Sequence, residues 1–483
     1  MELPVGARPE AEPEALLFSP EERESFFDSI ARHQRAAVRV ALVADACAFA
    51  LALVVAMLMS PLCYAVLGIV LDLVNFAVPM PDLIGMVTDA VLEMTDHPET
   101  VSLWGWLELA ALASLPGLAL MVLTIRGLSR VMRAAMASDV GCFESRAPNP
   151  AVLAEQRFAN VVAEMAIAAG LTAPRVLVSD SAAVNAAAFG VDSAHATVVV
   201  TTGLLAEVNR AELQGVAASV VGSIANGDMA IGARVATILG LFGLTAKLAE
   251  SFGDRDAARR LGRLLLNAFR RKGSAAHGEL AMTLTNPFEP AKERAVASPV
   301  DSGRIPWRTI LLMPLVGPLV ISGFFGGLLC AFALGPLLAL SWRRRKYLAD
   351  ATAVRLTRDP DGLGGALMKM RGLPVEGAFG AWVAHMSVLP SGLIGAKSIL
   401  GGSSVPMSPS LDRRLKALGV MGAQVSLRAG RTMPPWAWIV LGPLMAVLAV
   451  LMSAVVFGLL YVSVALSGLF TWFPAVLVNA LLR

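Results

Sequence analysis

The side chains that most often do chemistry are scattered through this sequence of 483 residues. No two of the five histidines have the spacing of metal ligands, and each fits a surface or packing position. The four cysteines lie far apart and fit neither a disulfide framework nor a metal-binding knuckle. Gly392–Ser398 lacks the GxxxxGK spacing of a phosphate-binding loop, so we interpret it as a flexible loop. None of these residues by itself predicts a reaction. The histidines are His33, His97, His195, His277 and His385, and the cysteines are Cys47, Cys63, Cys142 and Cys330.

The chain that must position any functional site is unusually apolar. Charged residues make up 16% of the chain, against roughly 25% in a typical soluble domain, and 56% of the residues are hydrophobic. A uniformly water-soluble globule could not bury that much apolar surface. The net charge of +3, from 40 basic and 37 acidic residues, is too small to indicate a nucleic-acid partner. We therefore predict an integral membrane protein that contacts the lipid bilayer and binds no nucleic acid.

Charge patterning predicts how the N-terminal part crosses the membrane. Residues 1–36 are polar and acidic, lack the basic start of a secretory signal, and are predicted to be cytoplasmic. The N-terminal transmembrane region, residues 37–133, contains an almost uncharged run at 41–79 and a second apolar segment at 104–125. The predicted outer loop between them, residues 80–102, has five acidic residues and no Lys or Arg, whereas arginines flank the other ends. This pattern favours one crossing out and one back. The first run by itself fits two short spans, or one span followed by an interfacial or re-entrant piece after Pro61.

The rest of the chain alternates between polar and apolar segments. The polar parts predict a soluble domain with helices at Ala151–Ala169 and Glu212–Ala225, and a small sheet or hairpin from Arg175–Ser179 and Thr197–Thr202. Basic residues flank both ends of the apolar run at 310–341, which conflicts with a single crossing there. We divide the remainder into residues 134–228, the first part of the domain; 229–250, an apolar helix that spans the membrane or is buried; 251–308, a basic loop; 309–342, a transmembrane segment; 343–431, the second part of the domain; and 434–483, a C-terminal transmembrane region.

The most informative stretch begins VVVTTGLL at Val198–Leu205 and continues to AASVVGSIANGDM at Ala217–Met229. This order resembles the HtpX-type membrane zinc metalloproteases, relatives of the CAAX prenyl proteases, whose segment reads like VTxGLL followed by LAHELSHIANGDM. The resemblance covers roughly residues 37–420. Weaker matches lie at Asn185 with Ala188–Gly190, which resemble the family's NAF segment, at Tyr347–Ala351, which resembles its ExxAD region, and at Pro409–Leu415, which resembles its HPPLEERI element.

The resemblance implies a fold and a location. The fold is an α-helical integral membrane protein with a cytoplasmic, mostly α zincin-like domain that contains a small β element. The location is the bacterial inner membrane, with the protease-like domain on the cytoplasmic side, as the arginine pattern also indicates.

The resemblance also shows which catalytic side chains are missing. In the family, two histidines four residues apart bind zinc from one helical face, and a glutamate beside the first is the general base. In this chain the histidine positions are Ser219 and Ser223, and the base position is Val220. The third ligand position is Lys346, and the histidine of the HPPLEERI element is Ser408. Hydroxyls are poor zinc ligands and an ammonium group repels a dication, so we predict no zinc, no catalytic residue and a pseudoprotease.

Several alternatives are consistent with the same residues. Ser219 and Ser223 fit ordinary helix packing, and Lys346 fits a membrane-interface anchor. In a sharper hypothesis, the Lys346 ammonium occupies the metal position and donates to both serines. In an enzymatic alternative, one serine and a desolvated Lys346 form a nucleophile–base pair of a hydrolase. A channel or transporter is a further alternative, because Asp45 and Asp72 lie in apolar segments where a carboxylate is costly.

The function that we favour from the sequence is non-catalytic. We predict a scaffold, regulator or binding subunit of a membrane protein complex, with a membrane protein or a client peptide segment as partner. A peptide could add to the strand at Thr197–Thr202 through main-chain groups alone, without a metal. The predicted groove residues beside that strand are Asn185, Phe189, Val199 and Thr201.

Overall fold

The computed structural model describes part of the chain. The described residues are 14–16, 22–78, 89, 102–136, 145–253, 255–270, 274–285, 335–371, 373, 386–389 and 408–427. The GLIGAKS segment, the C-terminal region 434–483, most of the predicted outer loop and most of the predicted span at 309–342 lie outside them.

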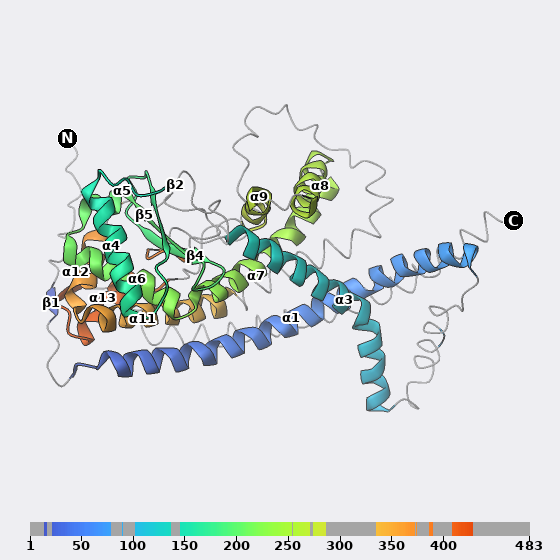
Figure 1. Cartoon of the computed structure of the whole chain (residues 1–483). Helices are drawn as coiled ribbons and strands as arrows, with labels where there is room; N and C mark the ends of the chain where they lie inside the picture. The colour runs from blue at the N-terminus through green and yellow to red at the C-terminus, as the bar shows by residue number, and fades with distance from the viewer. Residues whose placement is uncertain are drawn as a thin grey trace, which may run out of the picture.

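A four-stranded sheet lies in the compact domain formed by residues 145–225, 335–371 and 408–427 (Figure 1). Its strands are β2 (Ser145–Arg146), β3 (Arg175–Ser179), β4 (Ala186–Gly190) and β5 (Ala196–Thr201), in the order β2-β3-β5-β4. β3 and β5 are parallel, whereas β2 and β4 are antiparallel to their neighbours. The predicted small sheet is confirmed, but its two predicted strands do not form a hairpin. β5 is a central strand, and its valine run is buried, as expected where both faces of a strand are covered.

Helices pack against this sheet, and α6 contacts its edge strand β4 (Figure 1). The predicted helices at 151–169 and 212–225 are confirmed. α6 starts with a capping box, in which Asn209 and Glu212 exchange side chain–backbone hydrogen bonds of 2.9 and 2.8 Å, and it ends before Gly227 at φ 74°. The helices of this part are α4 (Leu153–Ala168), α5 (Thr202–Glu207), α6 (Arg210–Ala225), α11 (Gly335–Thr357), α12 (Pro360–Met370) and α13 (Leu411–Val420).

Two long helices extend away from the compact domain (Figure 1). α1 (Phe26–Ala77) has 52 residues and packs against α11 and α3. At a rise of ~1.5 Å per residue it is about 78 Å long, well beyond the ~30 Å of a bilayer core. The alternative of two short spans at 41–79 is therefore wrong, because the helix continues through Pro61 without a break. The second long helix is α3 (Leu103–Met136).

Among the described residues, Ser114–Met136 of α3 is the helical stretch that is by itself long and apolar enough to cross a membrane. It begins ten residues after Trp104, where the sequence predicted the returning span to start. α6 and the first part of α7 (Asp228–Gly253) pass the same test only together, as a pair bent by 72°.

Two predicted segments differ from the structure. Residues 251–308, predicted as a basic loop, contain the helices α8 (Arg255–Arg270) and α9 (Ser274–Thr285). Apolar side chains recur along α8 at helical spacing, and the high arginine content hid that period. The predicted boundary between residues 342 and 343 falls inside α11, which continues through both segments. A short strand pair, β1 (Glu14–Leu16) with β6 (Val425–Leu427), joins the N-terminal segment to the end of the domain.

Small residues set the contact between α1 and α3. A Cβ atom at Gly117 would lie 1.9 Å from the carbonyl oxygen of Ala56 and 2.5 Å from Oγ of Ser60. The Ser60 hydroxyl accepts from the Gly117 N–H at 3.0 Å and donates to the Ala56 carbonyl at 2.9 Å. The two backbones can approach this closely only because residue 117 has no side chain.

This contact predicts the effect of a small substitution. Alanine favours a helix over glycine by up to ~1 kcal/mol, but at position 117 the added methyl group must push α1 and α3 apart, which costs about 1–3 kcal/mol. We therefore expect Gly117→Ala to lower the melting temperature of the chain in mild detergent, measured by circular dichroism. Gly127→Ala in the same helix is the matched control, because nothing lies within 4 Å of its new Cβ, and it should not lower the melting temperature. Equal effects of the two substitutions would contradict the packing described here.

Candidate functional site

The candidate site lies where α6 and α11 cross. A Cβ atom at Gly222 of α6 would lie 3.1–3.2 Å from atoms of α11, so the two helices approach closely. Each helix presents two polar side chains, spaced four residues apart and therefore on one face. All four are buried: Ser219 and Ser223 from α6, and Lys346 and Asp350 from α11.

A buried ion pair organises this crossing. Arg414 of α13 donates from Nε to Oδ2 of Asp350 at 2.8 Å and from Nη2 to Oδ1 at 2.7 Å, and both side chains are 1% exposed. The Ser219 hydroxyl donates to the same Oδ1 at 3.2 Å. The remaining guanidinium nitrogen of Arg414 donates to the carbonyl oxygen of Val388 at 2.6 Å. One carboxylate on α11 therefore connects α6, α13 and the segment that contains Val388.

Lys346 binds main-chain oxygens. Its Nζ donates to the carbonyl of Ser387 at 2.7 Å and to that of Met386 at 3.4 Å, and it lies 5.9 Å from the centroid of the Trp342 ring. The side chain is 4% exposed, which excludes the alternative of an anchor at the membrane interface.

The charge of Lys346 is costly in this position. Burial lowers the pKa of its ammonium group to about 8, and the nearby guanidinium of Arg414 acts in the same direction. The carboxylates of Asp228 and Asp350 oppose this shift without cancelling it. The pKa of Lys346 therefore lies close to neutrality rather than in its ordinary range.

The two serines of α6 have other partners. Ser219 donates to Asp350. Burial raises the pKa of the Asp228 carboxyl, and the nearby Ser223 hydroxyl acts in the opposite direction without cancelling that shift. Asp228 also accepts from Nε of Arg345. The hypothesis that Lys346 donates to both serines is therefore wrong: the Ser219 hydroxyl donates to Asp350, and Lys346 donates to the backbone carbonyls of Met386 and Ser387.

The segment Met386–Leu389 completes the site. It pairs in antiparallel direction with β4, where the Val388 N–H donates to the carbonyl of Ala186 at 2.7 Å. Asn185 binds both main-chain groups of Leu389: its Nδ2 donates to the carbonyl at 2.8 Å, and its Oδ1 accepts from the N–H at 3.0 Å. All four residues of the segment are at most 5% exposed. The chain itself thus covers the start of the outer edge of β4.

The predicted groove is a closed interior. Asn185, Phe189, Val199 and Thr201 are each at most 2% exposed. β5 has β3 on one edge and β4 on the other, so no peptide can add to it. The prediction of a groove along Thr197–Thr202 is therefore wrong, because both edges of this strand are already paired. The sequence alone could not show that the strand is central.

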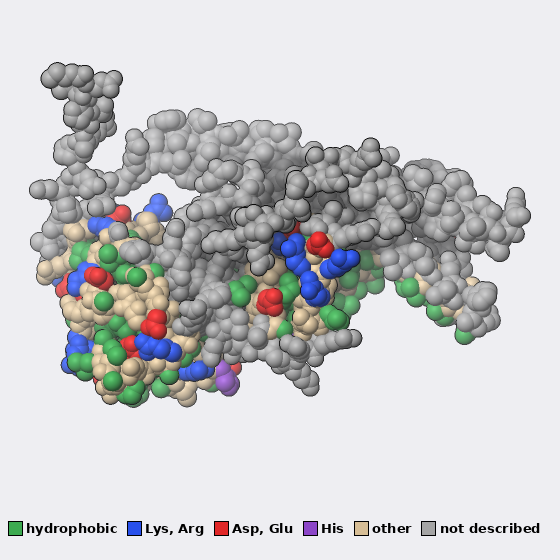
Figure 2. Space-filling model, turned by 90° about the horizontal axis from the view of Figure 1, so that it is seen from above, with side chains coloured by type: hydrophobic (Ala, Val, Ile, Leu, Met, Phe, Trp, Pro, Cys, Tyr) green, Lys and Arg blue, Asp and Glu red, His purple; other side chains and the backbone are tan. Residues whose placement is uncertain are grey.

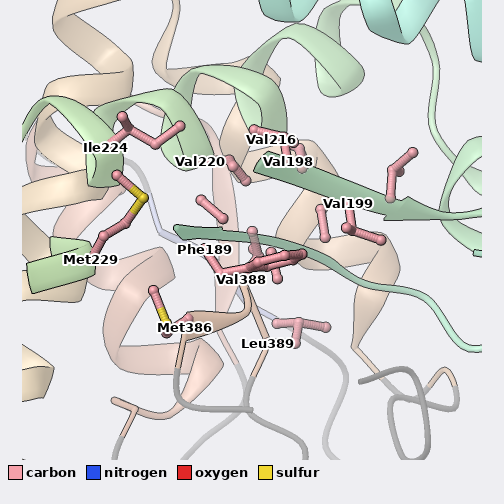
Figure 3. Close-up of a cluster of buried hydrophobic side chains, with 14 of the residues drawn as sticks. Phe189, Val198, Val199, Val216, Val220, Ile224, Met229, Met386, Val388 and Leu389 are labelled. Atoms are coloured by element: carbon pink, nitrogen blue, oxygen red, sulfur yellow. The ribbon is translucent and has the colours of Figure 1, made fainter. Parts of the chain in front are cut away.

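The position of the general base is apolar. Val220 lies in a cluster of buried hydrophobic side chains with Ile224 of the same helix, Phe189 of β4 and Val388 (Figure 3). Ser408, at the other degenerate position, is 2% exposed, and its hydroxyl has no hydrogen-bond partner. Val220 therefore cannot act as a general base, and Ser408 hydrogen-bonds to none of the polar side chains of the site described above.

Among the described residues, no histidine and no metal-binding group contributes to the site, and His97 and His385 lie outside them. Within the described ranges, no group of three or more His, Cys, Asp or Glu residues could hold a metal ion. His33 of α1 stacks on Tyr347 with ring centroids 5.1 Å apart, and burial lowers its pKa to about 4, so it is a neutral packing residue. His195 is exposed beside Asp192. The prediction of packing or surface roles is confirmed for these two histidines.

Sequence reasoning missed the centre of the site. Asp350 and Arg414 lie in the two matched elements Tyr347–Ala351 and Pro409–Leu415, and their opposite charges were the signal that could have paired them. Met386–Leu389 belongs to no motif, and it binds Lys346 from about 40 residues further along the chain. No local pattern could have found it.

Comparisons with known proteins agree on one family. The model of peptidase family M48 matches residues 153–297, which contain β3 to β5 and the helix α6. A protease HtpX homolog of Caldanaerobacter subterraneus is 30% identical over 263 residues, which cover 54% of this chain and 71% of that protein. The homologs of Thermoanaerobacter pseudethanolicus and Ligilactobacillus salivarius are 31% and 30% identical over 211 residues. Those two alignments cover 44% of this chain and little more than half of each relative, 55% and 56%. No solved structure matches the chain.

The environment of Lys346 predicts a pH dependence of stability. The folded protein loses this proton near pH 8, whereas an ordinary lysine keeps it to 10.5. Between these values the unfolded state binds more protons, so the contribution of Lys346 to the free energy of unfolding increases as the pH rises. We expect the melting temperature of the wild type, relative to Lys346→Met, to increase between pH 8 and 10.

The matched control is Lys416→Met, which removes an exposed lysine of α13. Its melting temperature relative to the wild type should stay constant over the same pH range. A difference for Lys346→Met that does not change with pH would show that the lysine keeps an ordinary pKa.

Proposed function

The chain belongs to peptidase family M48, and from this premise we propose that it is a catalytically inactive, membrane-embedded member of the HtpX type. It acts as a scaffold, regulator or binding subunit of a membrane protein complex in a bacterial inner membrane, with its peptidase-like domain in the cytoplasm. The relatives are named proteases, so the proposal depends on what this chain has in place of their site.

The set of side chains at the crossing of α6 and α11 is the observation that carries the proposal. At the positions that match the HtpX-type motif, Ser219 and Ser223 stand in place of two zinc-binding imidazoles, and Lys346 stands in place of a carboxylate. Neutral hydroxyls bind zinc poorly, and a buried ammonium group repels it. Ser219 and Lys346 are also engaged, with Asp350 and with main-chain carbonyls. The residues present therefore do not fit a zinc ion, and Val220 cannot activate water.

The contacts do not favour the alternative functions. A serine–lysine hydrolase needs a hydroxyl that donates to the lysine, but Ser219 donates to Asp350, and Lys346 donates to carbonyl oxygens. A transporter carboxylate faces a bundle interior or a water-filled path, but Asp45 is exposed on the surface of α1. The side chain of Asp72 lies outside the described part of the structure.

Exposed apolar helix surfaces support a membrane location and a membrane partner. Such surfaces are rare on soluble monomers and mark contact with lipid or with another protein. Because Met386–Leu389 closes the start of the β4 edge, we place the partner contact on α1 and α3 rather than in the former cleft. The exposed side chains are Leu42, Val43, Phe49, Leu67, Val70 and Val74 on α1, and Trp104, Leu115, Leu120, Val122 and Leu123 on α3.

Metal content tests the loss of catalysis. We expect the chain, purified without a chelating resin, to contain far less than one zinc per chain by inductively coupled plasma mass spectrometry, because the site repels a dication. An HtpX-type protease with an intact HExxH motif, purified in parallel, is the positive control. About one zinc per chain in this protein would overturn the proposal.

Affinity purification in mild detergent tests the binding role. We expect a membrane protein to be recovered with the wild type at fixed stoichiometry, measured by quantitative mass spectrometry. Leu120→Ser with Leu123→Ser should reduce that recovery at least several-fold, because both side chains are exposed on α3. Leu153→Ser with Ile167→Ser, on the exposed surface of α4, should leave it unchanged. Recovery of a well-folded wild-type chain alone would contradict the scaffold role.

A further inference from the structure

Helix α8 concentrates positive charge. Its 16 residues include five arginines and one aspartate, a sum of +4, whereas the whole chain sums to +3. The rest of the chain therefore sums to −1. A partner that recognises this helix through charge must be anionic.

Three arginines of α8 face outward. The helix packs against α7 and α9, and the face that it buries there is apolar. In the view from above, basic side chains gather where α8 lies, beside a few acidic ones (Figure 2). The inward side chains are Ala257, Leu261 and Ala268, and the exposed basic ones are Arg259, Arg260 and Arg263.

The position of α8 relates this basic face to the candidate membrane span. A Cβ atom at Gly240 of α7 would lie 2.6 Å from Cε of Met132 and 3.3 Å from Cδ2 of Leu128, so α7 packs on the last turns of Ser114–Met136. α9, which contacts α8, also packs on α3. The same end of α3 exposes three arginines and is the end that the positive-inside rule assigns to the cytoplasm. These arginines are Arg126, Arg130 and Arg133.

We propose that the exposed arginine face of α8 binds the headgroups of anionic phospholipids in the cytoplasmic leaflet. The inference rests on the proposed membrane location and is independent of the loss of catalysis. Guanidinium groups bind phosphate oxygens through paired hydrogen bonds, and basic residues beside an anionic leaflet add their attraction. Because the proposed contact is made by charged guanidinium groups, it is mainly electrostatic and weakens with salt.

Native mass spectrometry of the full chain tests this contact. The probe is a mixed micelle with equal amounts of phosphatidylglycerol and phosphatidylcholine, at low and high ammonium acetate concentration. We expect the wild type to retain phosphatidylglycerol preferentially at low ionic strength and to lose that preference at high ionic strength. Arg259→Gln with Arg260→Gln and Arg263→Gln should lower the ratio of the two retained lipids on the order of ten-fold. The corresponding triple lysine variant should keep most of the preference, since the charge is unchanged.

The matched control removes three exposed arginines from the compact domain, through Arg157→Gln, Arg175→Gln and Arg210→Gln. Its lipid preference should equal that of the wild type, and the melting temperatures of all variants check their fold. The proposal is overturned if the wild type shows no preference, or if the control and the α8 variant lose it equally. A chain that stays soluble without detergent would instead refute the membrane location, and this inference with it.

Discussion

The arrangement of the site depends on the buried charge pair between Asp350 and Arg414. Removing two ions from water costs several kcal/mol for each, and such a pair is tolerable only if its geometry is good and the remaining donors and acceptors are satisfied. Both conditions hold here: the guanidinium group binds the carboxylate through two nitrogens, Ser219 adds a third donor, and the carbonyl of Val388 takes the remaining nitrogen. Loss of one partner would leave an uncompensated buried charge, which costs about 3–5 kcal/mol. The relative positions of α6, α11 and α13 therefore depend on one another through a single carboxylate.

Arg414 is also one of three side chains that make Met386–Leu389 part of the core. Each of its four consecutive carbonyls accepts a hydrogen bond from a side chain of another element: the first two from Lys346, the third from Arg414 and the fourth from Asn185. A buried carbonyl without a donor costs about 1–3 kcal/mol, so these side chains make burial of the segment possible. In return, the segment gives Lys346 its acceptors. The lysine and the covered strand edge stabilise each other.

The parts of the fold that could be predicted are those with a local cause. The helix predicted at Glu212–Ala225 ends where α6 ends, before Asn226 and Gly227, and the β-branched run at Thr197–Thr202 predicted β5. The resemblance then located the two serines and the lysine at one crossing. The partners of Lys346 could not be predicted, because they are main-chain oxygens that carry no sequence signal. α8 was missed for another reason: its arginines made the segment as polar as a loop, although its apolar residues keep a helical period.

These contacts determine where a partner can bind. A peptide that paired with the start of β4 would have to displace Met386–Leu389 and leave the ammonium group of Lys346 buried without an acceptor. That exchange loses a set of satisfied hydrogen bonds and gains at best an equivalent set, so nothing drives it. The surfaces that are already exposed involve no such loss: the apolar sides of α1 and α3 and the arginine face of α8. The hydrogen bonds of Lys346 thus keep the start of the β4 edge covered, and in the proposed function a partner binds the exposed helices instead.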